Sequence, residues 1–169
     1  MGLMPGMKKM KSQIDAAGID GKNPSEYYLA LAEGKNPLIA TDEASFDFRI
    51  DFTMSQPPLL PWPLYSAFLR KTLARAEINK KIFSDMLATK NGLAETNFQQ
   101  SIETTIAKGN IPTLIMWGKE DRVLDVSAAA AFKDLIPTAK VHIFEGVGHL
   151  PMVEIPNESA DIYQQFLST

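Results

Sequence analysis

The sequence predicts an α/β fold in which a helical first part precedes a β-α-β-α unit with two parallel strands. Apolar residues recur at helical spacing up to about residue 108, and a short continuous apolar run follows at Pro112–Trp117. From Ile111 onward, strand and helix patterns alternate, as in folds with parallel sheets. We therefore divide the chain into a helical region at 1–108 and a sheet-forming segment at 109–169.

The first region reads as helices separated by glycine and proline turns. Helices are expected at Met7–Ala17, Ser25–Glu33, Asp42–Met54 with Thr41 as its capping residue, Leu64–Leu73, Ile82–Leu87 and Glu95–Lys108. Four prolines in Gln56–Pro63 remove backbone donors and favour extended geometry. That segment is therefore expected to be an apolar, stiff connector.

In the second region, the apolar run Pro112–Trp117, closed by Gly118, is typical of a strand buried on both faces. The alanine-rich segment Ser127–Ile136, stopped by Pro137, is expected to be a helix. Lys140–Phe144 is a second strand pattern, and Asn157–Leu167 is an amphipathic helix pattern. The two strands should lie parallel in one sheet.

Two acid-base side chains follow the two predicted strands. Asp121 comes just after the first strand and His149 just after the second. Adjacent parallel strands lie about 4.8 Å apart, so loops that leave their same ends can bring a carboxylate to an imidazole. A carboxylate bound to one ring nitrogen fixes the tautomer and leaves the other nitrogen able to accept a proton.

Other assignments compete with this pair. Asp125 is a second candidate for the acid, but it is also placed to cap the helix that starts at Ser127. Asp121 can alternatively serve only as a turn residue, and His149 as a structural loop histidine. His142 falls inside the second strand, where packing is the simpler interpretation.

The motifs around these residues resemble the acid and base segments of the α/β-hydrolase family. Trp117-Gly118-Lys119-Glu120-Asp121 is similar to W-G-x-x-D, and Gly146-Val147-Gly148-His149 to G-x-G-H. The helical region resembles the cap of bacterial lipases and esterases. The resemblance implies a serine carboxylic-ester hydrolase in which Asp121 is the triad acid and His149 the general base. It also implies that Glu154 supports the local structure.

One family motif is missing from the sequence. The nucleophile elbow G-x-S-x-G needs a serine with glycine two residues away on each side, and none of the ten serines meets that pattern. The oxyanion loop is absent as well. The resemblance thus predicts a C-terminal fragment of an α/β-hydrolase fold that is catalytically incomplete by itself, although Asp121 and His149 working without a covalent intermediate is a further alternative.

The helical region also holds candidate residues for a substrate pocket. Its aromatic and leucine side chains are either packed within the cap or arranged to line an acyl pocket. The candidates for such a pocket are Phe48, Phe52, Leu60 and Trp62.

Two further functions stay open. Epoxide, haloalkane and C–C bond hydrolysis use the same acid and histidine segments with different partners. A non-catalytic, self-associating module is the other alternative, because two parallel strands have open edges that must be covered. We accordingly expect a homodimer or a higher homo-oligomer, and a small acyl ester as substrate of the intact protein.

Composition narrows the remaining classes. The net charge of −3, with both signs interspersed, offers no field that would attract nucleic acid. With no cysteine and only two histidines, the sequence shows no metal cluster. It also lacks a glycine-rich phosphate-binding motif, so no cofactor is implied. A signal-peptide pattern and an apolar run long enough to span a membrane are not found either, and the compartment stays undefined.

Overall fold

A three-stranded parallel sheet lies beside a set of helices in the computed structural model, which describes residues 11–14, 19, 21–94, 104–106 and 111–168. The strands are β1 (Lys11–Ile14), β2 (Thr113–Gly118) and β3 (Lys140–Phe144), in the spatial order β1-β2-β3. In the register, Ile14 is opposite Met116, and Met116 is opposite His142. The predicted parallel pairing of β2 and β3 is confirmed.

Strand β1 corrects the sequence interpretation, which placed a helix over Met7–Ala17 and only two strands in the sheet. Lys11–Ile14 pairs along its whole length with Thr113–Met116 of β2. The segment has no apolar run of its own, so its strand conformation depends on a partner strand about a hundred residues away in sequence. The other residues of the predicted helix lie outside the described ranges.

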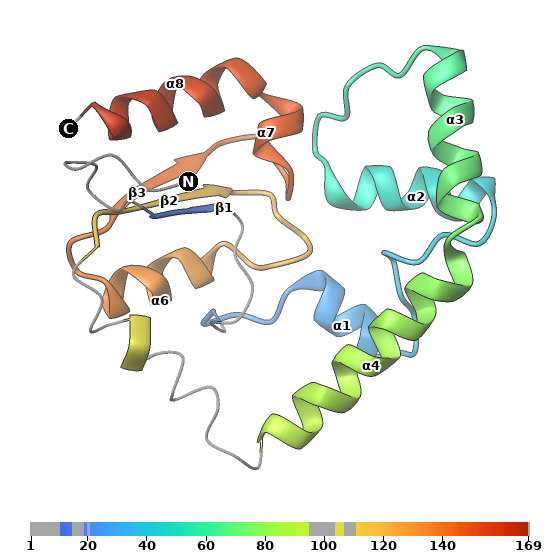
Figure 1. Ribbon diagram of the computed structural model, residues 1–169, viewed down its shortest axis with the longest axis horizontal. Helices are drawn as coiled ribbons and strands as arrows, with labels where there is room; N and C mark the ends of the chain where they lie inside the picture. The colour runs from blue at the N-terminus through green and yellow to red at the C-terminus, as the bar shows by residue number, and fades with distance from the viewer. Residues whose placement is uncertain (1–10, 15–18, 20, 95–103, 107–110, 169) are drawn as a thin grey trace, which may run out of the picture.

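Helices cover both faces of the sheet. Helix α6 (Ser127–Leu135) lies on one face, and α7 (Pro151–Glu154) and α8 (Pro156–Leu167) lie on the other (Figure 1). Side chains on a strand alternate between faces, so Ile115 and Trp117 pack against Phe132 and the alanines of α6, whereas Leu114 and Met116 pack against Phe166 of α8. Burial on both sides explains the continuous apolar run of β2.

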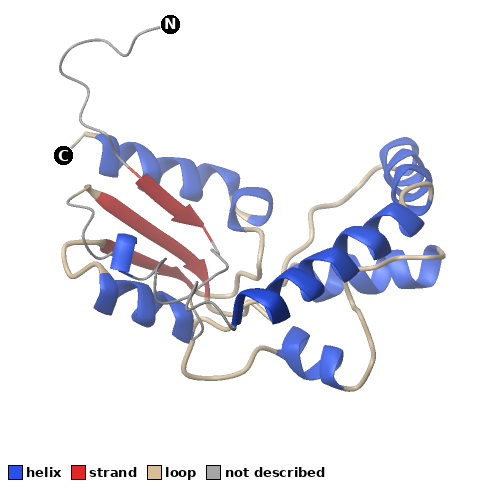
Figure 2. Ribbon diagram, turned by 60° about the horizontal axis from the view of Figure 1, so that its bottom comes forward, coloured by secondary structure: helices blue, strands red, loops and turns tan. Residues whose placement is uncertain are grey.

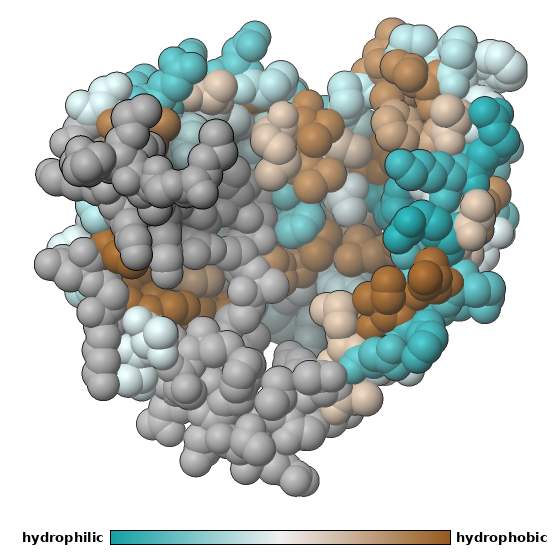
Figure 3. Space-filling model, in the orientation of Figure 1, coloured by the Kyte–Doolittle hydropathy of each residue, from teal (hydrophilic) through white to brown (hydrophobic). Residues whose placement is uncertain are grey.

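The helical region forms the other half of the molecule, with helices α1 to α4 at a distance from the sheet (Figure 2). Its elements are α1 (Glu26–Ala32), α2 (Glu43–Thr53), α3 (Trp62–Leu73) and α4 (Ala76–Ala94). Phe46 and Phe52 of α2 are buried. Large apolar side chains of α4 are exposed, among them Ile78, Ile82 and Met86. Brown, hydrophobic residues are also visible on the surface of the helical half in Figure 3.

The ends of these helices refine the sequence expectations. Helix α1 begins after Ser25, whose hydroxyl accepts the Tyr28 N–H at 3.1 Å. The cap of α2 is Asp42 rather than Thr41, because the Asp42 carboxylate accepts the Ser45 N–H at 2.8 Å. Helix α3 begins at Trp62, two residues inside the predicted connector, because proline is tolerated in a first helical turn.

The remaining helix predictions have different outcomes in different parts of the chain. Helices α6 and α8 match the predicted segments to within a residue, and α7 was not predicted. Residues 104–106 are helical, and the rest of the predicted helix Glu95–Lys108 lies outside the described residues. Within the described ranges, no helix combines the length and the apolar character needed to cross a membrane.

Candidate functional site

The loops that follow β2 and β3 meet at one end of the sheet. The Lys119 N–H donates to the Phe144 carbonyl at 2.9 Å, and the Glu120 N–H donates to the Val147 carbonyl at 3.0 Å. The Glu120 carboxylate accepts the Val147 N–H at 3.0 Å in return. These contacts hold the two loops in a fixed relation, so the side chains that they carry are held as well.

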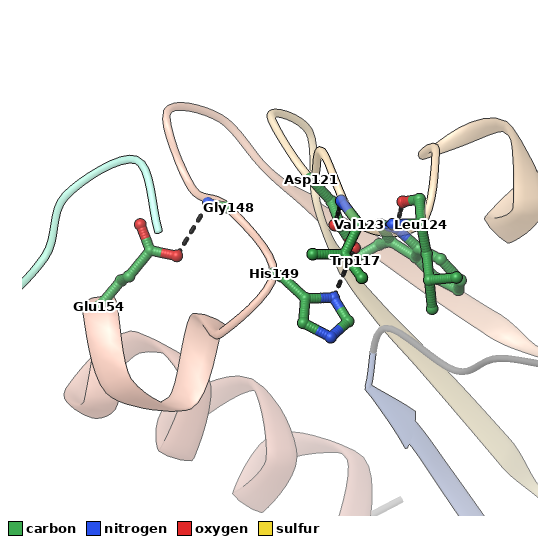
Figure 4. Close-up of polar contacts among 7 residues, drawn as sticks. All are labelled: Trp117, Asp121, Val123, Leu124, Gly148, His149 and Glu154. Carbon is green, nitrogen blue, oxygen red and sulfur yellow. Dashed lines mark hydrogen bonds and ion pairs between the residues drawn. The ribbon is translucent and has the colours of Figure 1, made fainter. Parts of the chain in front are cut away.

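Asp121 and His149 face one another from these loops (Figure 4). Nδ1 of His149 is 2.9 Å from Oδ2 of Asp121. The Asp121 side chain is fully buried, whereas the His149 side chain is 23% exposed. The arrangement expected from the sequence is thus present: a buried carboxylate bound to a histidine that solvent can still reach.

The second oxygen of Asp121 fixes the carboxylate in place. Its Oδ1 accepts the Val123 N–H at 2.8 Å and the Leu124 N–H at 2.9 Å. An ionised carboxylate only accepts hydrogen bonds, so Nδ1 of His149 must be the protonated ring nitrogen in this contact. Nε2, which points away from Asp121 in Figure 4, is then the nitrogen with a free lone pair. A base of this geometry can take a proton from a neighbouring hydroxyl or water.

Close backbone approach lets the two loops come together. A Cβ added to Gly118 would overlap the Gly148 carbonyl oxygen and lie 2.5 Å from that of Val147. Gly146 has a φ of +71°, a conformation that L residues with side chains rarely adopt. The glycines of both motifs are therefore required by space and by backbone geometry.

The rival residues lie elsewhere. The Asp125 carboxylate accepts the Ser127 N–H at 2.9 Å, at the start of α6, and the Asn23 side chain at 3.5 Å. His142 lies in β3 with its ring 4.5 Å from that of Phe144. Asp121 is therefore the side chain that lies against His149, whereas Asp125 and His142 have other partners.

Glu154 binds backbone groups on both sides of the site. Its Oε1 accepts the Gly148 N–H at 2.9 Å, and its Oε2 accepts the N–H groups of Ser55 and Gln56 at 2.8 Å each. The family resemblance had implied that Glu154 supports the local structure. The contact with the connector after α2 could not be found from sequence, because it joins segments nearly one hundred residues apart.

A hollow of about 420 Å³ lies next to this region, between α1, α2 and Arg122. Phe48 and Phe52 line it, with ring centroids 5.9 Å apart. Leu60 and Trp62 are not among its lining residues, and Trp62 is 78% exposed. The structure thus brings together two of the four residues considered for an acyl pocket.

Arg122 joins the helical region to the loop that carries the acid, and sequence reasoning did not single it out. Its Nε donates to Glu26 of α1 at 2.8 Å, and its guanidinium lies 4.5 Å from the centre of the Phe52 ring. Glu26 and Arg122 both line the hollow, so the hollow combines an apolar wall with a charged pair.

A second ion pair crosses the rim of the site. The Lys119 ammonium lies 2.6 Å from the Glu145 carboxylate, and both groups are exposed. The hydrogen bond with Glu145 and the negative charge of that residue raise the pKa of Lys119. In the described part of the chain, no group of three or more His, Cys, Asp or Glu side chains is arranged to hold a metal ion.

The chain is similar to a known protein family and to bacterial lipases. The sequence model for the alpha/beta hydrolase fold matches residues 14–156. Lipase 1 of Psychrobacter immobilis is 33% identical over 155 residues, which cover 92% of this chain and 46% of that lipase. Lipase 3 of Moraxella sp. (strain TA144) is 29% identical over 161 residues, covering 94% of this chain and 49% of the relative.

A solved structure shows the same likeness in three dimensions. The crystal structure of a membrane phospholipase A, described as a novel bacterial virulence factor, aligns with a TM-score of 0.81 at 35% identity. The alignment covers 94% of this chain and 48% of that structure. The chain spans about half the length of the curated lipases that it matches.

Proposed function

Because the chain belongs to the α/β-hydrolase family, we propose that it supplies the acid and the general base of a lipase- or esterase-like serine hydrolase of carboxylic esters. The contact of 2.9 Å between Nδ1 of His149 and Oδ2 of Asp121 is the observation that carries this proposal. It gives His149 the tautomer and orientation that nucleophilic catalysis by a serine requires.

In the proposed reaction, Nε2 of His149 takes the proton of a serine hydroxyl while the serine oxygen bonds to the acyl carbon. Nε2 then returns this proton to the alkoxy oxygen as the ester C–O bond breaks and the alcohol leaves. In the second half, Nε2 takes a proton from water while the water oxygen bonds to the acyl carbon, and it returns this proton to the serine oxygen as the acyl–serine bond breaks and the carboxylic acid leaves. Asp121 stays ionised and stabilises the positively charged imidazole in both halves.

The serine and the oxyanion donors of this reaction would come from residues outside the chain. None of its serines has the glycine spacing of the nucleophile elbow. We therefore propose that the chain alone has almost no activity, because a histidine and its carboxylate cannot replace the nucleophile and the oxyanion site. The substrate of the complete protein would be a small acyl ester.

The helical region would form the cap over the acyl part of the substrate. Phe48 and Phe52 supply an apolar wall for it, and Arg122 stands at the side of the acid loop. We propose the division at 108/109 as the boundary between cap and core, with Lys11–Ile14 counted with the sheet to which it pairs. Leu60 and Trp62 would then contact the acyl chain only in a complex in which the connector bends toward the hollow.

A chimera tests the proposed function. The part of Psychrobacter immobilis Lipase 1 that precedes the aligned region is fused in front of this chain, and hydrolysis of p-nitrophenyl butyrate is measured. We expect activity in the chimera, labelling by a fluorophosphonate probe, and loss of turnover by about 10⁶-fold in His149→Ala. A folded chimera whose activity survives that substitution contradicts the assignment of the base.

The chain alone provides the second arm of this test. Robust ester hydrolysis by the 169-residue chain, abolished by His149→Ala, contradicts the proposal that the nucleophile lies outside it. His142→Ala is the matched control, because His142 lies within β3 and has no bond to Asp121 among the described contacts. We expect the chimera to tolerate that change.

The sheet favours self-association as a second property of the chain. Among the described residues, β1 and β3 each pair with β2 alone, so each presents a further strand edge. We propose a homodimer or higher homo-oligomer in which strand edges or caps of two copies cover each other. Light scattering that shows a stable monomer at micromolar concentration contradicts this proposal.

A further inference from the structure

The Glu154 carboxylate lies between the cap and the histidine loop and binds both. Oε2 accepts two N–H groups of the connector that follows α2, from Ser55 and Gln56, each at 2.8 Å. Oε1 accepts the N–H of Gly148, the residue before His149, at 2.9 Å. One carboxylate thus fixes the position of the connector relative to the base.

Further contacts join the same two segments. The N–H of His149 donates to the Thr53 carbonyl, the last residue of α2, at 2.8 Å. Nε2 of the Gln56 side chain donates to the Gly146 carbonyl at 2.8 Å. A Cβ added to Gly148 would lie 2.9 Å from both the Ser55 nitrogen and the Thr53 oxygen. The backbone of the histidine loop therefore lies directly on the end of α2.

From these contacts we infer that Glu154 is a positioning residue that makes the alignment of His149 with Asp121 depend on the seating of the cap. The imidazole is carried by a loop whose backbone is bonded on one side to Glu154 and on the other to Thr53. Displacement of the end of α2 together with the connector that follows it removes partners from Glu154 and from the His149 N–H together. The catalytic meaning of this coupling rests on the proposed function, whereas the coupling itself is a property of the fold.

The chemistry of the side chain explains why an acid stands here. Three N–H donors converge on two oxygens, and a carboxylate offers only acceptors. A glutamine of the same shape would turn an NH₂ group toward an N–H group on one side. Hydrogen bonds to a charged acceptor are also stronger than those to a neutral one.

Two substitutions test the inference from opposite sides in the ¹⁵N-labelled chain. Glu154→Gln acts from the α7 side. Ser55→Pro acts from the cap side, because it removes one N–H donor, and Met54 already has the extended backbone (φ −130°, ψ 136°) that precedes proline. Ser55→Ala keeps the donor and is the matched control. Glu158→Gln, at an exposed glutamate in the first turn of α8, controls for loss of charge.

Two signals of His149 are measured by NMR: its Nδ1–H proton, bound to Asp121, and the hydrogen exchange of its backbone N–H, bound to Thr53. We expect both Glu154→Gln and Ser55→Pro to broaden or shift the first signal and to speed the second at least about tenfold. Both controls should match the unsubstituted chain. His142 is the only other histidine, so its signals provide an internal reference for the integrity of the sheet.

Two outcomes overturn the inference. In one, the signals of His149 are unchanged in both variants. In the other, the signals of His142 and His149 are lost together, which makes Glu154 a residue of general stability rather than of positioning. Failure of the proposed function is separate: an inactive chimera with coupled His149 signals contradicts the ester-hydrolase assignment alone, and an active chimera with unmoved signals contradicts only the positioning role.

Discussion

Gly118 at the end of β2 lies against the carbonyl oxygen of Gly148, with no room between them for a side-chain carbon. We expect Gly118→Ala to push the two loops apart and to lower the free energy of unfolding by at least about 2 kcal/mol, since overpacking strains the backbone. Gly34→Ala is the comparison, because Gly34 has a φ of +77° but no neighbour within 4 Å of an added Cβ.

Urea unfolding of the two glycine variants distinguishes the cost of steric overlap at Gly118 from the cost of a left-handed backbone at Gly34. The free energy of unfolding of the Gly34→Ala variant should fall by only about 1–2 kcal/mol, the cost of placing a residue with a side chain in the left-handed conformation. The Nδ1–H signal of His149 should move in Gly118→Ala and stay in Gly34→Ala. Equal effects of both substitutions on stability and on this signal would show that the loops do not depend on close approach at Gly118.

Replacement of Asp121 should separate its electrostatic role from its structural one. In Asp121→Asn, the amide NH₂ can face Nδ1 of His149 while the amide oxygen still accepts the Val123 and Leu124 N–H groups. The ring proton should then move from Nδ1 to Nε2, which ¹⁵N imidazole shifts report. Asp125→Asn serves as the control for the rival acid and should leave the tautomer as it is.

Asp121→Ala should cost more stability than the asparagine variant. The alanine leaves two backbone N–H groups without an acceptor, and that of the buried Val123 cannot reach water easily. We expect a loss of about 1–3 kcal/mol, measured by the shift of the urea midpoint. An alanine variant as stable as the asparagine variant would mean that these backbone groups find other acceptors.

The fluorescence of the two tryptophans tests whether the start of helix α3 is exposed in solution. Trp117 is fully buried and its indole N–H donates to the Leu124 carbonyl at 3.1 Å, whereas Trp62 is 78% exposed. Trp62→Phe should leave blue-shifted fluorescence that acrylamide quenches poorly. Trp117→Phe should leave fluorescence that is quenched readily. Strong protection of Trp62 in the chain would show that the start of α3 is covered, by self-association or by bending of the connector.

The stabilisation of helix α2 by its N-cap residue, Asp42, should weaken in acid. The hydroxyl of Ser45 and then its N–H donate to the Asp42 carboxylate, and these hydrogen bonds lower the pKa of Asp42 below its ordinary value of 3.8. A lowered pKa in the folded chain means that the stabilisation is complete above pH 3.8 and is lost as the pH falls through the folded pKa. The advantage of the unsubstituted chain over Asp42→Ala should thus shrink in that range.

Urea midpoints measured across this range check the prediction, and Asp42→Asn is the matched control. Asparagine also caps helices but carries no titrating group. Its advantage over alanine should therefore change little with pH. A constant gap between the unsubstituted chain and Asp42→Ala down to the acid limit would mean that the carboxylate does not have these partners in solution.

The sequence predicted the part of the site that depends on local pattern. Strands β2 and β3 each carry enough of their own signal, an apolar run or a bounded alternation, to be found without their partners. Asp121 and His149 follow them directly, so the parallel arrangement of the strands was sufficient to predict their approach. The preference for Asp121 over Asp125 as the partner of His149 followed in the same way, since Asp125 is placed to cap the next helix.

The rest depended on contacts between distant segments. Lys11–Ile14 is polar for most of its length and becomes a strand only because β2 offers it an edge. The contact of Glu154 with the Ser55 and Gln56 N–H groups depends on where the connector after α2 passes. Helix α7 is a single short turn, below the length at which periodicity can be recognised.

The spatial order β1-β2-β3 determines how the helical segment between β1 and β2 can be replaced by that of a related protein. Helices α1 to α4 are inserted between the two neighbouring strands β1 and β2, while Asp121 and His149 lie after β2 and β3. Because the cost of closing a loop grows slowly with its length, an insertion at this point can be lengthened, shortened or replaced without redesign of the sheet. We therefore expect a different helical insertion to be compatible with the same contact between Asp121 and His149, provided that it ends a helix where a carbonyl can accept the His149 N–H, as that of Thr53 does.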